Sequence, residues 1–263
     1  MSPIITATLS VGIIGLIIGV LLVLLGRKFA VEVNEYQAAV RDCLPGNNCG
    51  GCGYAGCDAL AAAIANGEAP ANACPVGGAP VAEKISHIMG VEISETEKTV
   101  AFVKCSGDCD HAVNRANYVG LSDCQAAVNA GLSPKGCADG CLGLGSCVSA
   151  CPFDAIHVVN GVAHVNRSLC KSCAKCVAAC PKHLIEIVPD SAQYAVKCAN
   201  TDRGPVVKKV CSAGCLACKV CEKQCENDAI HVENNVAHID YSKCTKCGKC
   251  AEKCKPQVIS KRF

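Results

Sequence analysis

Two runs of closely spaced cysteines have the pattern of cluster ligands. Residues 170–181 read CKSCAKCVAACP, which is C-x2-C-x2-C-x3-C followed by proline, and residues 244–254 (CTKCGKCAEKC) repeat the spacing without an immediate proline. In this pattern three thiolates wrap one [4Fe-4S] cluster, and the fourth binds a second cluster. Zinc needs four ligands around one ion and commonly uses paired CxxC motifs. The spacing therefore favours iron–sulfur clusters over zinc.

The chain contains a duplicated module. Nine cysteines between Cys124 and Cys180 recur 74 residues later, between Cys198 and Cys254. The segments 155–170 and 229–244 are identical at ten of sixteen positions. Each copy is predicted to contain a Cys-rich turn and short helix, a hairpin with alternating apolar residues, and a second Cys-rich turn and helix. Asn160-Gly161 is a strong hairpin turn, and Asn234-Asn235 is a weaker one.

The cysteines of the two copies divide into sets of four. In the later copy we expect the sets Cys215, Cys218, Cys221, Cys254 and Cys225, Cys244, Cys247, Cys250. The earlier copy has Leu144 where the later one has Cys218, and we expect Cys137 to supply the missing ligand. Its predicted sets are Cys137, Cys141, Cys147, Cys180 and Cys151, Cys170, Cys173, Cys176. A three-iron cluster at the first of these sites is the alternative.

A separate glycine-rich block lies nearer the N-terminus. Cys49, Cys52, Cys57 and Cys74 follow a C-x2-C-x4-C-x16-C pattern. The glycines among the first three cysteines permit the backbone angles that turn several sulfur atoms toward one centre. A helix is predicted from about residue 58 to 66. The block is expected to bind a further [4Fe-4S] cluster.

Six cysteines remain after these assignments: Cys43, Cys105, Cys109, Cys124, Cys198 and Cys211. Cys105, Cys109 and Cys124 could form part of a sixth site completed by Cys198 or Cys211. Grouping the same three with Cys137 instead would leave the first ferredoxin site one ligand short. The sequence thus predicts five [4Fe-4S] clusters and leaves a sixth open. Cys43 is interpreted as a free thiol.

The first 28 residues predict a single membrane-spanning helix. No charged residue occurs from Pro3 to Gly26, and a helix of that length reaches about 36 Å, which exceeds a hydrocarbon core of about 30 Å. A cleaved signal peptide is the alternative, but the charges follow the apolar run and no cleavage site is evident. Arg27 and Lys28 place the rest of the chain in the cytoplasm, where thiols stay reduced and bind metal more often than they form disulfides.

Composition indicates several small domains with little ordinary core. The 263 residues include 26 cysteines, 3% aromatic residues and no tryptophan, so metal must supply part of the stability. The expected fold class is α+β: a transmembrane helix, a helical 4Fe-4S domain and two tandem bacterial-type ferredoxin modules. The predicted boundaries are 1–28 for the anchor, 29–100 for the 4Fe-4S domain, 101–136 for a Cys-containing connector, 137–190 for the first module, 191–210 for a linker and 211–263 for the second module.

These motifs together resemble a known family. The block CGGCGYAGC with its later CPVGG, and the run GCLGLGSCVSACPFDAI (140–156), closely resemble the B subunit of the Rnf complex, a membrane-bound ferredoxin:NAD+ oxidoreductase. The resemblance implies that the chain accepts electrons from reduced ferredoxin and relays them to other membrane and peripheral subunits, with coupled Na+ or H+ movement. Cys43 lies outside the family's four-ligand block, and Glu226 replaces the proline that would follow Cys225. The alternative is a membrane-tethered polyferredoxin that serves a hydrogenase or another reductase.

The distribution of charge and the absence of certain motifs limit the kinds of partner expected for this chain. Residues 31–100 have nine acidic and three basic residues, whereas residues 197–263 have seven acidic and thirteen basic. An acidic soluble ferredoxin would be steered to the lysines of the second module, although a solvated lysine face is the simpler interpretation. The basic residues concerned include Lys243, Lys246, Lys249, Lys253 and Lys255.

No GxGxxG or P-loop is present, so NAD+ is expected to react on another subunit and no independent catalytic site is expected. Nothing predicts a nucleic-acid surface.

Overall fold

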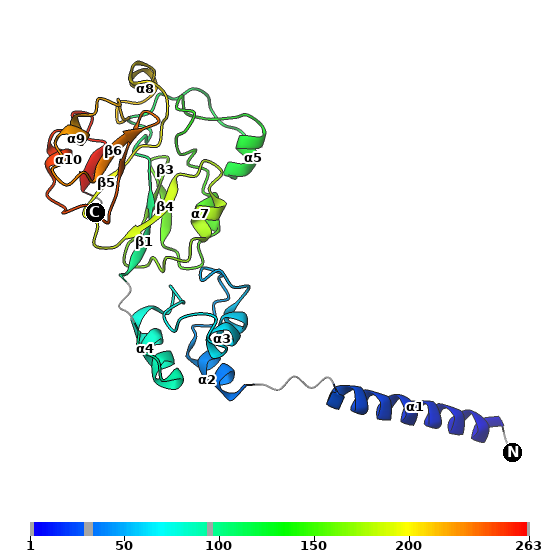
Figure 1. Cartoon of the computed structure of the whole chain (residues 1–263). Coiled ribbons are helices and arrows are strands. Elements are labelled where there is room, and N and C mark those ends of the chain that lie inside the picture. Colours follow the sequence, from blue (N-terminus) through cyan, green and yellow to red (C-terminus); the bar gives the residue numbers. More distant parts are fainter. Residues whose placement is uncertain (1–2, 29–33, 94–96, 262–263) are drawn as a thin grey trace.

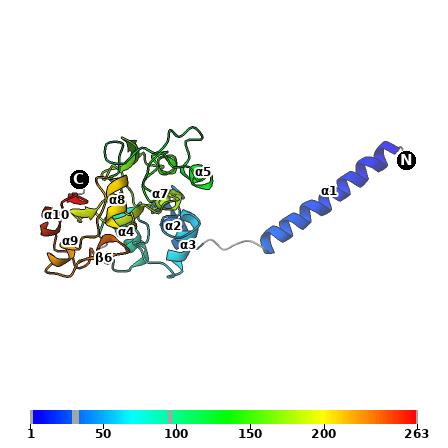
Figure 2. The ribbon, with the colours of Figure 1, turned by 90° about the horizontal axis from the view of Figure 1, so that it is seen from above.

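The computed structural model describes residues 3–28, 34–93 and 97–261 (Figure 1). Helix α1 (Pro3–Lys28) stands apart from the other elements in Figures 1 and 2, and its side chains are described only for residues 12–25. Across the described residues, no helix meets the length and apolarity of a membrane span. The predicted anchor therefore stays a prediction, and its residues 1–2 lie outside the described part of the chain.

Three helices form the N-terminal domain. They are α2 (Glu35–Cys43), α3 (Cys57–Ala65) and α4 (Gly78–Met89). Asn34 caps α2, because its side chain accepts a hydrogen bond of 3.0 Å from the Tyr36 N–H, and Gly90 ends α4 with a left-handed φ of 65°. Leu60 and Ile85 fill the small core between the helices. The helix predicted near residues 58–66 corresponds to α3.

The first ferredoxin module combines two antiparallel strand pairs with two short helices. Strand β1 (Thr99–Val103) pairs with β4 (Ile185–Pro189), and β2 (Ile156–Val159) pairs with β3 (Val162–Val165). The helices are α6 (Ser146–Ser149) and α7 (Lys175–Ala179). The predicted hairpin turn is confirmed, with φ values of 48° and 77° at Asn160 and Gly161. Because β1 belongs to this sheet, the module includes residues outside the predicted range 137–190.

The second module repeats this arrangement. Strand β5 (Tyr194–Val196) pairs with β8 (Ile259–Lys261), and the predicted hairpin forms from β6 (Ile230–Glu233) and β7 (Val236–Ile239). Its short helices are α9 (Val220–Lys223) and α10 (Lys249–Glu252). Helices α5 (Cys124–Asn129) and α8 (Gly204–Val210) lie between the first strand of each module and its first Cys-rich turn.

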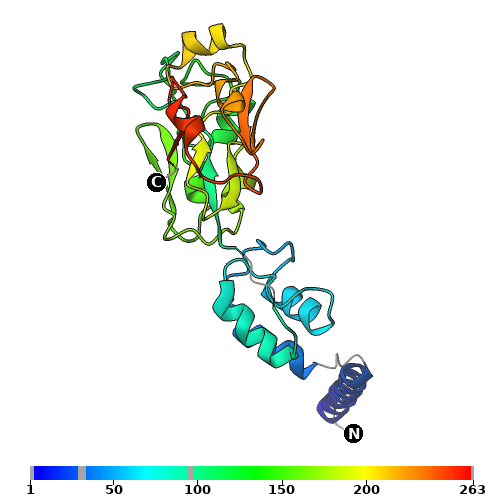
Figure 3. The same ribbon diagram turned by 60° about the vertical axis from the view of Figure 1, so that its left-hand side comes forward.

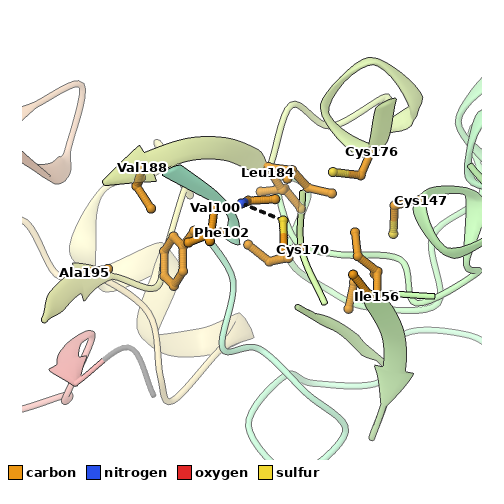
Figure 4. Close-up of a cluster of buried hydrophobic side chains, with 14 residues drawn as sticks. Val100, Phe102, Cys147, Ile156, Cys170, Cys176, Leu184, Val188 and Ala195 are labelled. Atoms are coloured by element: carbon orange, nitrogen blue, oxygen red, sulfur yellow. Dashed lines mark hydrogen bonds between the residues drawn. The ribbon is translucent and has the colours of Figure 1, made fainter. Parts of the chain in front are cut away.

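Each module has its own small core, so the apolar residues form separate clusters. Val100, Ile156 and Leu184 are central in the first module (Figure 4), and Ile230 and Val258 are central in the second. Figure 3 shows the modules side by side, with the N-terminal domain at one end and α8 at the other. The mixed helix and sheet content agrees with the predicted α+β class.

The N-terminal domain touches the first module through backbone at Gly51. A Cβ atom at this position would lie 2.8 Å from the Cys173 Cα and 2.9 Å from the Cys173 carbonyl oxygen. Real Cβ atoms do not approach backbone so closely, and backbone can yield less than a flexible side chain. Only glycine therefore permits this contact, which brings the loop of Cys49 and Cys52 against the loop of Cys173.

We predict that Gly51→Ala loosens this contact, because the added methyl group has to push the two loops apart. The expected loss of unfolding free energy is about 1–3 kcal/mol, with faster hydrogen exchange in residues 170–175. Gly136→Ala is the matched control, since its Cβ would meet its neighbours no closer than 3.5 Å. Equal stability and exchange in the two anaerobically purified variants would contradict the prediction.

Candidate iron–sulfur sites

Four cysteines of the N-terminal domain form the first group, called the N-terminal site: Cys49, Cys52, Cys57 and Cys74. Asn48 shapes the loop, because its side-chain oxygen accepts a hydrogen bond of 2.8 Å from the Cys57 N–H at the start of α3. The Gly77 N–H donates to the Cys74 Sγ at 3.4 Å. Burial raises the pKa of the Cys74 thiol, and the nearby thiols of Cys52 and Cys57 raise it further. The structure thus brings Cys52, Cys57 and Cys74 together, and Cys49 directly follows Asn48, whose side chain binds the Cys57 N–H.

The second module brings together both of its predicted sets. The second-module outer site (Cys225, Cys244, Cys247, Cys250) lines one pocket. The second-module inner site consists of Cys215, Cys218, Cys221 and Cys254. Burial raises the pKa of the Cys250 thiol to about 11, with added effects of Cys244, Cys247 and Cys225. Burial also raises the pKa of Cys221 to about 11, and its other three group members add to the shift.

In the first module, the four cysteines of the first-module outer site also lie together: Cys151, Cys170, Cys173 and Cys176. Burial raises the pKa of the Cys176 thiol to about 11, and the thiols of Cys170, Cys173 and Cys151 add to it. Strand β1 contributes directly, since the Ala101 N–H donates to the Cys170 Sγ at 3.4 Å, as Figure 4 shows from the module core. This contact explains why residues before the predicted module belong to its fold.

The remaining group of the first module differs from the predicted one at a single position. One pocket is lined by Cys124, Cys141, Cys147 and Cys180, here called the first-module inner site. Burial raises the pKa of the Cys147 thiol to about 12, followed by the effects of Cys141, Cys124 and Cys180. The structure thus places Cys124, and not Cys137, beside the other three cysteines.

Cys124 reaches this position through a hydrogen-bonded connection between α5 and α6. Its backbone N–H donates to the Ser146 hydroxyl at 2.6 Å, and that hydroxyl donates to the Asp123 carboxylate at 2.9 Å. Asp123 also caps α5 by accepting from the Ala126 N–H at 2.7 Å. Since Ser146 directly precedes Cys147, these bonds hold the first residue of α5 next to the Cys-rich turn.

Cys137 belongs instead to a group at the boundary between the two modules. Four cysteines, here called the seam site, line one pocket: Cys105, Cys137, Cys198 and Cys211. Burial raises the pKa of the Cys198 thiol to about 11, with Cys215 and Cys105 among its charged neighbours. Sequence reasoning missed this set because its members come from four segments without a shared motif.

Two cysteines lie outside all six groups. Cys43 ends α2 and packs against the core of the N-terminal domain. Cys109 is exposed near the Asn160-Gly161 turn, where its backbone N–H donates to the Asn160 carbonyl oxygen at 3.0 Å. The structure divides Cys105, Cys109 and Cys124, which the sequence suggested for a sixth site, among two groups and an exposed turn.

The turns that carry the thiols use the left-handed backbone region in both modules. Non-glycine residues with positive φ recur at matched positions 74 residues apart, for example Ser172 and Lys246 (56° and 62°) and Asp154 and Asp228 (50° each). Consecutive turns of this kind point several N–H groups toward one anionic centre. Bonds of 3.3–3.4 Å to Cys225 and Cys151 show the same orientation. The repeated turns thus give both modules the same thiol geometry.

These donor sets fit cubane clusters. Within the residues that the structure describes, no three donors lie close enough together to share one metal ion. The thiolates of a [4Fe-4S] cluster bind separate irons at its corners, so its ligands stand farther apart than those of one zinc ion. The sets of four free cysteines, with backbone N–H groups directed at sulfur, supply donors of the kind that bind such a cluster.

Three pairs of neighbouring cysteine groups lie close together. The Cys141 N–H donates to the Cys105 Sγ at 3.5 Å, and the Cys215 N–H donates to the Cys198 Sγ at 3.3 Å. The seam site therefore touches the inner site of each module. At the far end of the first module, Cys49 lies near enough to Cys173 to raise the pKa of its thiol, after the larger effect of burial.

Comparison with known families identifies the same regions. Residues 44–76 match the family described as "Putative Fe-S cluster", residues 132–181 match a 4Fe-4S dicluster domain, and residues 236–259 match a 4Fe-4S binding domain. With the cysteine groups, these matches show that the chain binds several [4Fe-4S] clusters.

Relatives cover nearly the whole chain. The B subunit of the Na+-translocating ferredoxin:NAD+ oxidoreductase complex of Acetobacterium woodii is 46% identical over 95% of this chain and 75% of its own length. The B subunit of the ion-translocating oxidoreductase complex of Methanosarcina acetivorans is 45% identical over 95% of both chains. The B subunit of the proton-translocating ferredoxin:NAD+ oxidoreductase complex of Clostridium ljungdahlii is 43% identical over 98% of this chain and 93% of its own. The chain therefore belongs to the family of B subunits of the ion-translocating oxidoreductase complexes, the Rnf complexes.

Proposed function

We propose that this chain is the iron–sulfur electron-transfer subunit of a membrane-bound, ion-translocating ferredoxin:NAD+ oxidoreductase. The observation that carries the proposal is the set of six cysteine groups, in which the seam site touches the inner site of each module and Cys49 of the N-terminal site lies near Cys173 of the first-module outer site. When bound, [4Fe-4S] clusters supply one-electron redox chemistry. The chain itself holds the thiols, buries or partly buries all of the assigned ones except Cys218 and Cys247, and keeps neighbouring groups close together. With no nucleotide-binding motif in the chain, NAD+ would be reduced on another subunit.

We assign each group four ligands. The order along the series is the second-module outer site, the second-module inner site, the seam site, the first-module inner site, the first-module outer site and the N-terminal site. The assignment differs from the sequence-based one in placing Cys124 at the first-module inner site. It also gives the chain six clusters instead of five, because Cys137 becomes a ligand of the seam site.

The second module is the proposed docking surface for reduced ferredoxin. Cys173 of the first module and Cys247 of the second occupy matched positions, but Cys173 is covered by the Gly51 loop whereas Cys247 is exposed. Cys218 of the same module is also exposed. An exposed ligand shortens the path to a partner in solution. The open position thus leaves one end of the series accessible to a donor.

Charge near this open position suits an acidic donor. Lys243, Lys253 and Lys255 are exposed around the second module, whereas Lys249 forms an ion pair with Glu226. Lys243 makes only a long contact of 3.9 Å with Asp228. Exposed lysines of this kind attract a negatively charged protein before contact, which raises the rate of encounter.

The opposite end of the series points to the membrane subunits of the complex. The N-terminal domain is attached to α1, whose described apolar side chains from Ile13 to Leu25 are exposed in the structure. We propose that lipid or neighbouring membrane helices cover them, with the iron–sulfur domains on the cytoplasmic side. The electron given up by reduced ferredoxin would then pass toward the membrane subunits, where its transfer is coupled to ion movement.

The ligand assignment predicts different outcomes for two cysteine variants. Cys124→Ser should change one cluster signal to a three-iron type, because three cysteines of the first-module inner site remain, while Cys137→Ser should alter a different signal, that of the seam site. Low-temperature EPR with iron and sulfide analysis of anaerobic protein measures both, and the unsubstituted chain should contain about 24 iron atoms for six cubanes. The assignment fails if Cys137→Ser produces the change expected of Cys124→Ser, or if the unsubstituted chain contains about 20 iron atoms.

The docking surface predicts a specific effect of charge reversal. Changing Lys243, Lys253 and Lys255 to Glu should slow reduction by ferredoxin about tenfold at low salt, with the difference shrinking as salt rises. The matched control reverses Arg203, Lys208 and Lys209 at α8, all of them exposed, which changes the net charge equally. Stopped-flow reduction of the purified complex measures both rates. Equal slowing in the two triple variants would show that total charge, and not this surface, controls the encounter.

A further inference from the structure

We propose that Lys135 and Asn200 raise the reduction potential of the seam site, so that an added electron is held at the boundary between the two modules. The inference rests on the proposed function, because it requires that the seam site binds a cluster. It concerns two residues outside the ligand set, which would act on the site through charge and hydrogen bonding.

Burial singles out these two side chains. Among the described residues, the only polar or charged side chains that count as buried are Lys135, 7% exposed, and Asn200, 2% exposed. Both line the seam cavity with Cys105, Cys137, Cys198 and Cys211. Burying polar groups is costly unless they are bonded or serve a nearby charge. Their concentration at one of six sites therefore requires an explanation specific to that site.

The Lys135 ammonium is held in place by backbone carbonyls. Its Nζ donates to the Gly107 oxygen at 2.6 Å and to the Gly161 oxygen at 2.7 Å. Gly107 lies directly against the site, since a Cβ there would be 3.3 Å from the Cys211 Sγ and 3.7 Å from the Cys105 Sγ. The ammonium thus binds the loop that passes over two of the four sulfur atoms.

No carboxylate neutralises this ammonium within the described residues. The acidic groups around the site have other partners: Asp139 accepts from the Thr201 N–H at 3.0 Å, and Asp108 pairs with His111 at 2.6 Å. The other lysines that line the cavity, Lys104 and Lys197, are only partly buried, and Lys104 is paired with Glu186 at 3.2 Å. Lys135 is therefore the buried positive charge at this site that no acid offsets.

Asn200 acts on the same site from a second direction. Its Nδ2 donates to the Cys137 Sγ at 3.1 Å. The orientation of the amide follows from its other bond, because the Asp202 N–H donates to the Asn200 Oδ1 at 2.7 Å. The side chain thus presents its N–H donor to sulfur.

Both contacts favour the reduced form of a bound cluster. Four thiolates give an oxidised [4Fe-4S] site a net negative charge, and reduction adds another. A nearby positive charge lowers the energy of that added electron, most strongly where water is excluded. Hydrogen bonds to the sulfur atoms act in the same direction. Lysines at other sites lack this combination, since Lys171 beside Cys170 is exposed and Lys249 near Cys250 is paired with Glu226.

The test is an EPR-monitored redox titration of the full-length protein, purified anaerobically. The signal that disappears in Cys198→Ser identifies the seam site. Lys135→Met should lower the reduced-to-oxidised ratio of that signal at least tenfold at a fixed potential, which equals 59 mV for one electron. Lys135→Arg should keep the original ratio, because it keeps the charge. Lys171→Met is the matched control and should leave all signals in place.

Two further variants keep the test decisive if Lys135→Met loses the seam iron. Lys135→Gln keeps donors for the two carbonyls without the charge, and Asn200→Asp keeps the acceptor for Asp202 but removes the donor to Cys137. Each should lower the same ratio. An unchanged ratio in any neutral Lys135 variant that retains its iron overturns the role of Lys135, and an unchanged ratio in Asn200→Asp overturns that of Asn200. If Cys198→Ser loses neither iron nor a signal, the six-site assignment itself has failed.

Discussion

The structure depends on bringing four thiols from separate positions to one centre and keeping them away from water. Burial raises the pKa of the Cys147 thiol to about 12, and the neighbouring thiols of Cys141, Cys124 and Cys180 raise it further. Iron binds the thiolate form of cysteine. The protein therefore tolerates several thiolates in one place, because the bound iron offsets their negative charge. Left-handed turns and backbone N–H groups aimed at sulfur supply the rest of the compensation. The short helices and two-stranded sheets are the minimum framework that holds those turns.

The contact between the two modules extends this principle beyond a single ferredoxin fold. A module with two sites can transfer an electron only between those two sites. Two modules without a further site would leave a gap between the inner site of one and the inner site of the other. The seam site, built from the connector and from residues that precede both inner sites, fills that gap. Its contacts to Cys141 and Cys215 join the modules. The proposed role of Lys135 and Asn200 fits this position. The seam site lies between the two modules, so its reduction potential affects electron transfer in both of them.

The two copies of the module differ where they contact different neighbouring segments. In the first copy, Leu144 stands where the second copy has Cys218, and Cys124 on α5 lies beside the other three cysteines, where Ser146 and Asp123 hold it. The same copy is covered at Cys173 by the N-terminal domain, whereas Cys247 of the second copy is exposed. A duplicated unit therefore has one closed and one open end. This asymmetry gives the proposed electron path a direction that two identical modules would lack.

The amino-acid sequence by itself determined the local features: the duplicated module, the ferredoxin spacing, the hairpin at Asn160-Gly161 and the kind of cofactor. These follow from interactions between residues near one another in the chain, which a spacing pattern records. The exchange of Cys124 for Cys137 and the seam site depended on the tertiary structure. Cys105 and Cys211 are more than a hundred residues apart, and their approach results from the packing of β1, the connector and α8. Spacing carries no record of such packing, because contacts between distant segments are set by the shapes of the folded modules.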